Sequence, residues 1–327
     1  SAASDVYKRQ ELYCPHCYKQ INDKELLFFK PSCGDKLPPP APSVLQKLGI
    51  GGTPSSISCT RNNKSTCKIC DRILSFRACP ICKGGISANR EGKPLIIAIA
   101  GTAGSGKSSY IRAVINQLRK LSEICGWTIM EQDAGSSKNS MYLIRKRKSD
   151  KGRLIVFAEV TEEKLSPALM TALSGIVCLV DPLQVEALRN ELETTNIVLP
   201  PLNGTEPHRL LLKLGRACPA VPLAVAVSKL DALACPDINY TGRWRLKTTE
   251  RLVCRDSSYR GSLDQEEMET VSCEMESWVA AADVNIMEAC KVFTRKLFFG
   301  VSTKEPALRV EDPLLWILSQ KRVTESK

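Results

Sequence analysis

The sequence feature that most constrains the fold is the glycine-rich stretch IAIAGTAGSGKSSY at residues 97–110. It contains the pattern G-x-x-x-x-G-K-S, which runs from Gly101 to Ser108. The apolar, β-branched run at 94–100 predicts a buried strand before the loop. After the loop, apolar residues recur at helical spacing as far as Leu118. This order of strand, glycine loop and helix is the context that a phosphate-binding P-loop requires.

A loop of this kind binds the phosphates of a nucleoside triphosphate. Its glycines let backbone N–H groups turn inward around the phosphates, and the following helix N-terminus adds positive potential. We expect Lys107 to reach the β- and γ-phosphates and the Ser108 hydroxyl to ligate Mg²⁺. The predicted phosphate-binding residues are Gly101, Gly104, Ser105, Gly106, Lys107, Ser108 and Ser109.

From residue 94 onward, strand patterns alternate with helical patterns, which is typical of an α/β parallel sheet. The predicted strands are at 94–100, near 127–131 and 140–147, and at 153–158, 175–181, 222–227 and 297–301. The predicted helices are at 108–122, around Val185, Leu188 and Leu192, and at 284–296. We therefore expect an α/β, GTPase-like P-loop NTPase with a mostly parallel sheet flanked by helices, preceded by a small zinc-ribbon module. The ligand of such a sheet lies at the carboxyl ends of its strands.

The chain has 15 cysteines, and its first part contains three C-x-x-C pairs. The pairs Cys67/Cys70 and Cys79/Cys82 stand eight residues apart, and two such knuckles can close a tetrahedron around Zn²⁺. An odd number of cysteines beside a nucleotide-binding loop favours a reducing cytoplasm over a disulfide scaffold. The zinc sites are expected to be structural, because four protein ligands leave no open position for catalysis.

A first zinc site is expected at Cys14/Cys17, with partners from Cys33, Cys59 or His16. The sequence also allows the knuckles to exchange partners between the two sites. We expect four segments in the chain: 1–10, non-native or disordered; 11–90, the zinc-ribbon region with a Pro/Gly linker; 91–320, the P-loop domain; and 321–327, a tail.

Two further strand ends indicate which base is bound. Ser228-Lys229-Leu230-Asp231 resembles the guanine-recognition motif N/T-K-x-D, and Ser302-Thr303-Lys304 resembles the second base-contacting motif, S-A-K. An aspartate can accept from both N1–H and the exocyclic amine of guanine, whereas adenine offers no such donor pair. The predicted guanine-binding residues are therefore Ser228, Lys229, Asp231, Ser302, Thr303 and Lys304, and GTP is favoured over ATP.

In order, the zinc knuckles, the P-loop, GIVCLVDPLQ (175–184), S-K-L-D, F-F-G-V-S and RVEDPLLW (309–316) resemble the bacterial double-GTPase family of the TRAFAC class. The likeness covers most of 11–318, and GIVCLVDPLQ and RVEDPLLW are its more specific parts. The family's GTPase-like domains belong to bacterial multi-gene systems, often proposed to act in conflict or defence. The resemblance implies a GTPase-type fold and a switch within a larger complex, with protein partners from the same gene system.

The catalytic residues of hydrolysis are not assigned by the sequence. GTPases of this type usually carry D-x-x-G at the end of the strand expected at 153–158, where the Asp helps hold Mg²⁺ and the Gly amide senses the γ-phosphate. This chain has Ala158-Glu159-Val160-Thr161 there, so both marker residues are missing. Glu159 is one position off and is expected to point to the other strand face unless a bulge intervenes. We therefore expect weak or absent hydrolysis with binding retained.

Other residues near this site have open roles. Asp181 has the appearance of a magnesium-assisting carboxylate, but we prefer a structural role at the start of a helix. Glu162 and Glu163 are candidates for orienting a water. The candidates for a switch hydroxyl are Thr128, Ser136, Ser137 and Ser140.

The leading interpretation is a GTP-binding switch or scaffold with weak or absent hydrolysis. The first alternative is an active GTPase that uses a displaced carboxylate. The second is a zinc-ribbon nucleic-acid-binding ATPase, motivated by the net charge of +11 and the basic run Arg145–Lys148, although that run is better interpreted as a solvated hairpin tip.

The expected cofactors are GTP, Mg²⁺ and Zn²⁺, and the expected partners are a guanine nucleotide and proteins of the same system. Nucleic acid is a weaker expectation. No apolar run reaches the roughly 18 residues that a membrane span needs, and no secretory signal is visible, so we expect a cytoplasmic protein.

Overall fold

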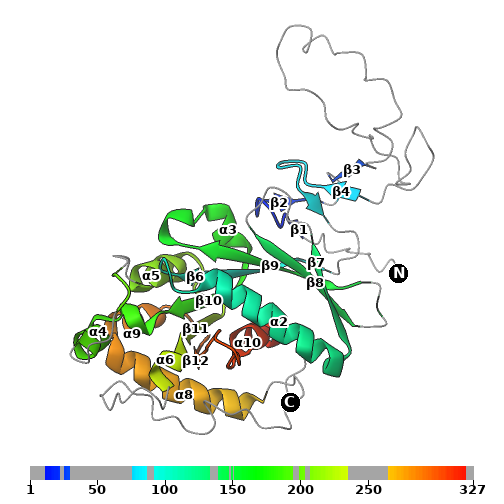
Figure 1. The fold of residues 1–327 in the computed structure, drawn as a ribbon. Helices are drawn as coiled ribbons and strands as arrows, with labels where there is room; N and C mark the ends of the chain where they lie inside the picture. The colour runs from blue at the N-terminus through cyan, green and yellow to red at the C-terminus, as the bar shows by residue number, and fades with distance from the viewer. Residues whose placement is uncertain are drawn as a thin grey trace, which may run out of the picture.

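A seven-stranded sheet in the order β12-β11-β10-β6-β9-β8-β7 forms the centre of the structure (Figure 1). The computed structural model describes residues 12–22, 26–29, 76–86, 92–132, 139–146, 149, 151–193, 199–202, 207–234 and 264–321. The strands of the sheet are β6 (Leu95–Gly101), β7 (Trp127–Gln132), β8 (Ser140–Lys146), β9 (Arg153–Val160), β10 (Leu173–Val180), β11 (Leu223–Val227) and β12 (Lys296–Gly300). Neighbouring strands from β12 to β9 are parallel, whereas β8 and β7 form an antiparallel hairpin at one edge.

Helices cover both faces of the sheet. They are α2 (Lys107–Cys125), α3 (Pro167–Ala172), α4 (Glu186–Leu192), α5 (Pro207–Ala217), α6 (Leu230–Ala234), α8 (Gln265–Ala282), α9 (Val284–Cys290) and α10 (Asp312–Gln320). Helices α2 and α10 pack on one face, and α3, α4, α5, α8 and α9 supply the core of the other (Figure 1). The sequence dictates this arrangement, because side chains of a strand alternate between its two faces. In β6, Ile97 and Ile99 lie in the α2 core, and Ile96 and Ala98 lie in the opposite core.

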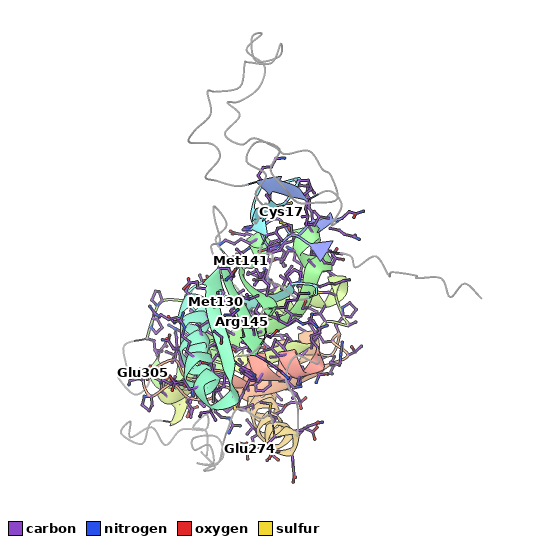
Figure 2. The ribbon with its side chains drawn as sticks, turned by 90° about the vertical axis from the view of Figure 1, so that its right-hand side faces the viewer. Cys17, Met130, Met141, Arg145, Glu274 and Glu305 are labelled. Atoms are coloured by element: carbon purple, nitrogen blue, oxygen red, sulfur yellow. The ribbon has the colours of Figure 1, made fainter. Side chains whose placement is uncertain are left out.

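The predicted fold class is confirmed. All the predicted strands are present, and their ends differ from the predicted ends by two residues or less. The central strands β6 and β11 are buried along their whole length, as parallel strands covered on both faces must be. Edge strand β7 remains half exposed, and Met130 on it is 38% exposed (Figure 2).

The predicted helix at 284–296 was wrong at its carboxyl end, because α9 stops at Cys290. A continuing helix would place the Thr294 amide on the Cys290 carbonyl. That amide donates instead to the carbonyl oxygen of Pro219 at 3.1 Å. Because this amide bonds to Pro219, the helix does not continue and the chain turns after Cys290. The Phe293 side chain is buried in this turn, before β12 begins. The sequence analysis also missed α3, α5, α8 and α10, which have clear amphipathic or apolar faces.

The cysteine-rich region forms short strands beside the large sheet. They are β1 (Leu12–Tyr13), β2 (Gln20–Ile21), β3 (Leu27–Phe29), β4 (Phe76–Ala78) and β5 (Gly85–Ile86). Strands β1 and β2 pair with each other, and β4 pairs with both β3 and β5. Two C-x-x-C turns, one between β1 and β2 and one between β4 and β5, are therefore each enclosed by a small hairpin.

Candidate nucleotide-binding site and metal centre

The glycine loop lies between β6 and α2, as the P-loop pattern predicts. Gly101 and Gly106 have φ angles of 155° and 91°, values that favour glycine. A Cβ on Gly101 would lie 2.5 Å from Ser105 Oγ and 2.9 Å from the Leu179 carbonyl oxygen. The glycine at 101 is therefore needed for the close approach of the loop to β10. Helix α2 has no acidic residue in its first turn, so its positive N-terminus remains available to an anion.

Lys107 folds back over the loop. Its ammonium donates to the carbonyl oxygens of Gly101 at 3.0 Å and Thr102 at 2.7 Å. Burial lowers the pKa of Lys107, and the negative charge of Glu159 opposes this shift. Ser108 follows with an exposed side chain. The loop thus presents a cation, a hydroxyl and a helix N-terminus together, which is the set that a triphosphate with Mg²⁺ requires.

Glu159 lies on the α2 face of the sheet, opposite to the face of Ala158, as the sequence predicted for a strand without a bulge. The pairing of β9 with β6 is continuous, so no bulge displaces the residue, which pairs with Ile99. Because alternate residues of a strand share a face, Glu159 lies on the side of Phe157, which packs in the α2 core. Among the neighbouring charges that act on Lys107, that of Glu159 has the largest effect on the pKa, and it raises the pKa. The strand therefore places a carboxylate where its charge acts on Lys107 of the glycine loop.

A pocket of about 310 Å³ borders the outer side of the loop. The backbone of Gly101–Ala103 forms one wall, Thr161–Glu163 forms the second, and α5 supplies the third. Lys213 of α5 forms an ion pair with Glu162, with Nζ and Oε1 at 3.3 Å. Glu162 and Glu163, which are candidates for orienting a water but have no place assigned by the sequence, thus lie beside the P-loop.

The two motifs that resemble guanine-recognition sequences lie after the ends of adjacent strands. Ser228 follows β11, and Ser302 follows β12, which pairs with β11. The Ser302 hydroxyl donates to Oδ1 of Asp231 at 2.6 Å, and the Lys304 amide donates to the Ser302 hydroxyl at 3.2 Å. Ser302 also exchanges two backbone hydrogen bonds with Leu308, which closes the loop that carries Thr303 and Lys304. The structure therefore brings together the residues that the two motifs predict.

Lys229 has a partner that the sequence analysis missed. Its ammonium forms an ion pair with Oδ2 of Asp181 at 2.5 Å. The other oxygen of Asp181 accepts from the Leu183 amide at 3.0 Å and caps the 3-10 turn Pro182–Gln184. The preferred structural role of Asp181 at a helix start is confirmed, and the residue also fixes the lysine of the S-K-L-D motif. Lys229 has a φ of 53°, a conformation that this pair helps to hold.

The switch candidates separate into two groups. Thr128 follows the carboxyl end of α2, and a helix of 19 residues is about 28 Å long, so Thr128 lies at the opposite end of the helix from Lys107. Ser140 opens β8 at the edge of the sheet where β9 ends, because β8 and β9 are antiparallel. Ser136 and Ser137 lie outside the described residues. Of the two described candidates, only Ser140 lies at the phosphate edge.

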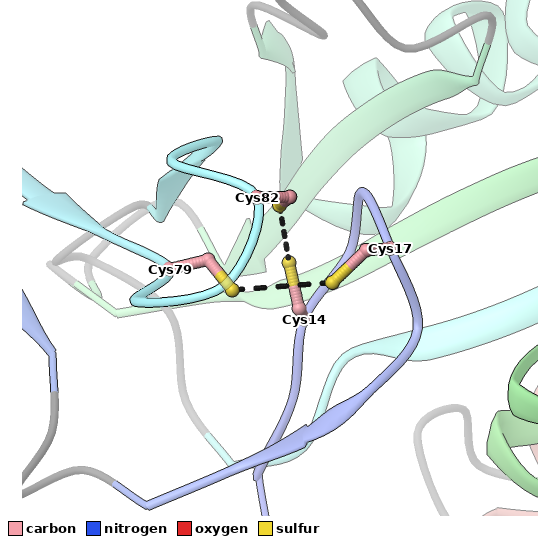
Figure 3. A group of neighbouring side chains, drawn as sticks. All are labelled: Cys14, Cys17, Cys79 and Cys82. Atoms are coloured by element: carbon pink, nitrogen blue, oxygen red, sulfur yellow. Dashed lines mark hydrogen bonds between the residues drawn. The ribbon is translucent and has the colours of Figure 1, made fainter. Parts of the chain in front are cut away.

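Four cysteine sulfurs form a cluster that fits a metal ion (Figure 3). The Sγ atoms of Cys14, Cys17, Cys79 and Cys82 lie within 4.8 Å of one another. Sγ of Cys14 is 3.6 Å from that of Cys82, and Sγ of Cys17 is 3.9 Å from that of Cys79. Four sulfurs about 2.3 Å from a tetrahedral Zn²⁺ are about 3.8 Å apart, whereas a disulfide requires about 2.05 Å. The separations therefore match a zinc tetrahedron.

The pairing of the knuckles differs from the predicted one. The sequence spacing predicted that Cys79/Cys82 share a metal ion with Cys67/Cys70, the nearest pair along the chain. The structure joins them to Cys14/Cys17, because β1 and β2 place the first knuckle opposite the second. This is the exchange of partners that the sequence left open. Cys33, Cys59, Cys67 and Cys70 lie outside the described residues.

The two knuckles have the same backbone design. In each, the amide two residues after the first cysteine donates to its sulfur at 3.4 Å, from His16 to Cys14 and from Ile81 to Cys79. Each turn ends in a residue with positive φ, Tyr18 at 61° and Lys83 at 63°. His16 is not part of the sulfur cluster, because its Nε2 contacts the Gly85 carbonyl oxygen at 2.7 Å. This contact joins the first knuckle to β5, the strand that follows the second knuckle.

The RVEDPLLW stretch, which directly follows the loop between Ser302 and Leu308, forms a buried ion network. The Arg309 guanidinium donates from Nε to Asp312 at 2.7 Å and from a terminal nitrogen to Glu267 at 2.8 Å. The side chains of Arg309 and Asp312 are 2% and 1% exposed. This network joins the starts of α8 and α10. It explains the charged residues within an otherwise apolar stretch as structural partners.

The basic run expected at a hairpin tip lies at the carboxyl end of β8. Arg145 pairs with Thr128 and Lys146 pairs with Trp127 of the edge strand β7. Arg147 and Lys148 lie outside the described residues. Among the helices in the described part of the chain, none is both long enough and apolar enough to cross a membrane.

The sequence matches no protein-family model and no curated protein. Among solved structures, the chain is similar to translation elongation factor SelB from Methanococcus maripaludis, crystallised with the GTP analogue GppNHp. The identity is 13%, the TM-score is 0.31, and the match covers 72% of this chain and 35% of the SelB chain. The chain thus spans about a third of the length of that protein. At this TM-score the structural likeness is weak. The assignment of a GTPase-like P-loop fold therefore rests on the sheet order and on the loop between β6 and α2.

Proposed function

We propose that this chain is a GTP-binding switch or scaffold protein that holds GTP and Mg²⁺ at the P-loop and hydrolyses the nucleotide weakly or not at all. The observation that carries the proposal is the hydrogen bond from Ser302 to Asp231. It joins the two motifs that resemble guanine-recognition sequences, at the strand ends of the sheet that holds the P-loop.

Guanine selectivity is proposed to come from Asp231. The Asp231 carboxylate, in the first turn of α6 shortly after β11, can accept from the two neighbouring donors of guanine, and adenine has no such pair. A site built for a donor rejects a base that lacks it, because its own polar group is left unpaired. Lys229, held by Asp181, supplies an aliphatic stem along which a base can lie.

The chemistry that Mg²⁺ would supply is neutralisation of charge on the β- and γ-phosphates. Lys107 and the N-terminus of α2 bind the same phosphates, and the exposed Ser108 hydroxyl is the proposed ligand of the ion. The proposed metal centre of the cysteine-rich region is Zn²⁺ held by Cys14, Cys17, Cys79 and Cys82. This ion has a structural role, because four thiolates complete its coordination.

A second candidate function is an active GTPase, and the position of Glu159 favours it. In place of the missing D-x-x-G aspartate, this carboxylate lies on the α2 face and raises the pKa of Lys107. A glutamate is longer than an aspartate by one methylene, so it can reach the phosphate edge from a neighbouring position. Turnover with Mg²⁺ separates this function from binding alone.

We assign the wider role by the sequence resemblance. The stretches GIVCLVDPLQ and RVEDPLLW support membership of the bacterial double-GTPase family, in which such a domain would act with protein partners of one multi-gene system in the cytoplasm. In the structure these two stretches hold Lys229 and join α8 to α10, respectively.

The experiment that tests the proposal measures the affinity of the full chain for GTP, GDP and ATP, with and without Mg²⁺, followed by a turnover assay. We expect GTP to bind at least about 10-fold more tightly than ATP. Equal affinities for GTP and ATP would refute guanine recognition. Magnesium-dependent turnover that is abolished by Glu159→Gln would establish the active GTPase instead of the switch.

A further inference from the structure

The first zinc knuckle contacts the nucleotide-binding domain through a pair of reciprocal hydrogen bonds. The Tyr18 hydroxyl donates to Oδ1 of Asn139 at 2.7 Å. The side-chain amide of Asn139 donates in turn to the Pro15 carbonyl oxygen at 3.1 Å. Both knuckle residues are adjacent to proposed metal ligands, Cys14 and Cys17. A single asparagine is therefore tied at two points to the turn that the metal would shape.

Apolar contacts reinforce the hydrogen bonds. The rings of Tyr13 and Tyr18 pack against the core cluster that lies on the sheet face opposite α2. Met141 of β8 belongs to this cluster, two residues after Asn139, and Figure 2 shows it on the sheet below Cys17. The knuckle is thus seated on the part of the sheet where β8 begins.

The start of β8 lies at the phosphate edge of the sheet. Ser140 pairs with Phe157 of β9, and β9 ends at Val160, directly before Thr161 in the wall of the pocket beside the P-loop. Strand β9 lies between β8 and β6, so β8 is two strand spacings, about 10 Å, from the strand that enters the P-loop. Asn139, directly before Ser140, therefore adjoins the strands that border the P-loop.

Among the residues that the structure describes, the second knuckle makes no such hydrogen bond to the start of β8. Lys83 occupies the position that Tyr18 has in the first knuckle, with nearly the same φ. Its ammonium donates to the Pro80 carbonyl oxygen of its own turn at 2.8 Å. The two knuckles share one sulfur cluster, but the described contacts to β8 come from the first. This asymmetry separates a role in metal binding from a role in contacting the nucleotide domain.

From these contacts we infer that Tyr18 is a positioning residue that links the zinc centre to the nucleotide site through Asn139. The inference rests on the proposed binding of Zn²⁺ and GTP. With the metal bound, the first knuckle holds Tyr18 and Pro15 in place, and they hold Asn139 and the start of β8. Without the metal, the turn loses its anchor and the start of β8 is released. By linkage, zinc tightens nucleotide binding and nucleotide retains zinc by the same factor.

The test compares the full-length wild type, Tyr18→Phe, Asn139→Ala and the matched control Lys83→Met, each with zinc and after chelation. The readouts are zinc content, affinity for a fluorescent GTP analogue with Mg²⁺, and hydrogen exchange of the β8 amides. In the wild type, we expect chelation to weaken the binding of the GTP analogue by about 5-fold or more and to accelerate hydrogen exchange of the β8 amides. Lys83→Met should behave in the same way.

Tyr18→Phe keeps the ring that packs on the core and removes only the hydroxyl. We expect it to retain zinc, to bind nucleotide more weakly than the wild type, and to respond less to chelation. Asn139→Ala should show the same pattern from the other side of the contact. A Tyr18→Phe protein that responds to chelation as the wild type does, in affinity and in β8 exchange, would overturn the inference, as would a Lys83→Met protein that loses the response.

Failure of the proposed function has a different signature. If the zinc-loaded wild type binds no guanine nucleotide, GTP binding is refuted, and β8 exchange still decides whether the knuckle positions the strand. Chelation that leaves β8 exchange unchanged then overturns the link between the zinc centre and β8. If chelation accelerates β8 exchange in the wild type and has a smaller effect in Tyr18→Phe, the link between the zinc centre and β8 is supported.

Discussion

The hydroxyl of Ser302 donates a hydrogen bond to Asp231 at 2.6 Å and joins two motifs that lie 71 residues apart in the sequence. Ser302 is 2% exposed and its loop is closed by Leu308, so the hydroxyl has a fixed position. The contact orients the Asp231 carboxylate from one side. A carboxylate that is oriented in advance loses less conformational freedom when it binds a base.

Asp231→Asn is expected to weaken GTP binding by about 10-fold or more. The substitution replaces an acceptor by an amide donor and removes the charge that strengthens each hydrogen bond to guanine. Selectivity should relax toward xanthosine triphosphate, whose extra carbonyl accepts where the guanine amine donates. Competition binding with GTP, xanthosine triphosphate and ATP measures both effects. Unchanged GTP affinity and base preference would show that residues 228–231 are only a strand end.

Lys107→Ala is expected to abolish triphosphate binding while leaving the fold intact. The ammonium is the side-chain cation of the glycine loop, and it neutralises charge on the β- and γ-phosphates. Lys120→Ala, on the exposed surface of the same helix, is the matched control and should bind normally. Titration with a fluorescent GTP analogue makes the comparison. Tight binding by the Lys107 variant would place the nucleotide elsewhere.

Lys229→Met is expected to lower the free energy of unfolding by about 1–3 kcal/mol, because it leaves the buried Asp181 carboxylate without its cation. The lysine is 35% exposed, so solvent reduces the loss below that of a fully buried pair. Lys213→Met breaks the more exposed ion pair with Glu162 and should cost less than about 1 kcal/mol. Denaturant unfolding of both variants checks the order, and equal losses would contradict a structural role for Asp181.

Glu159→Gln is expected to shift the alkaline limit of nucleotide binding to lower pH. Burial lowers the pKa of Lys107 and the charge of Glu159 raises it, so the neutral variant lowers this pKa further. Binding needs the charged ammonium and is lost as the pH rises through the Lys107 pKa. The loss should therefore begin at a lower pH in the variant than in the wild type. Superimposable pH profiles would show that Glu159 does not act on the phosphate site.

Cys14→Ser and Cys79→Ser are expected to remove the same zinc ion, because their sulfurs belong to one cluster. The double variant should then lose no more zinc than either single variant. If Cys79 instead shared an ion with Cys67 and Cys70, as the sequence spacing predicted, the two losses would add. Metal analysis of the purified single and double variants separates these outcomes. Purified wild-type protein without zinc would refute the metal centre.

Local patterns in the sequence determined most of the large domain. The apolar runs predicted the seven strands of the sheet, and the glycine pattern predicted the loop, because strand burial and positive φ angles leave direct marks on residue choice. Helix ends were less predictable. Whether α9 continued past Cys290 depended on the Pro219 carbonyl, which comes from a segment far away in the chain.

Only the tertiary structure decided which distant side chains meet. Spacing along the chain predicted that Cys79 shares a metal ion with the nearest knuckle. The pairing of the small strands instead places Cys14 and Cys17 beside Cys79. Alternation along β9 already predicted that Glu159 points away from the face of Ala158, and only the pairing with β6 decided that no bulge changes this. The contacts of Asp181 with Lys229 and of Tyr18 with Asn139 join segments 48 and 121 residues apart. No local propensity reports such contacts, because they form only when the packing of the sheet brings the segments together.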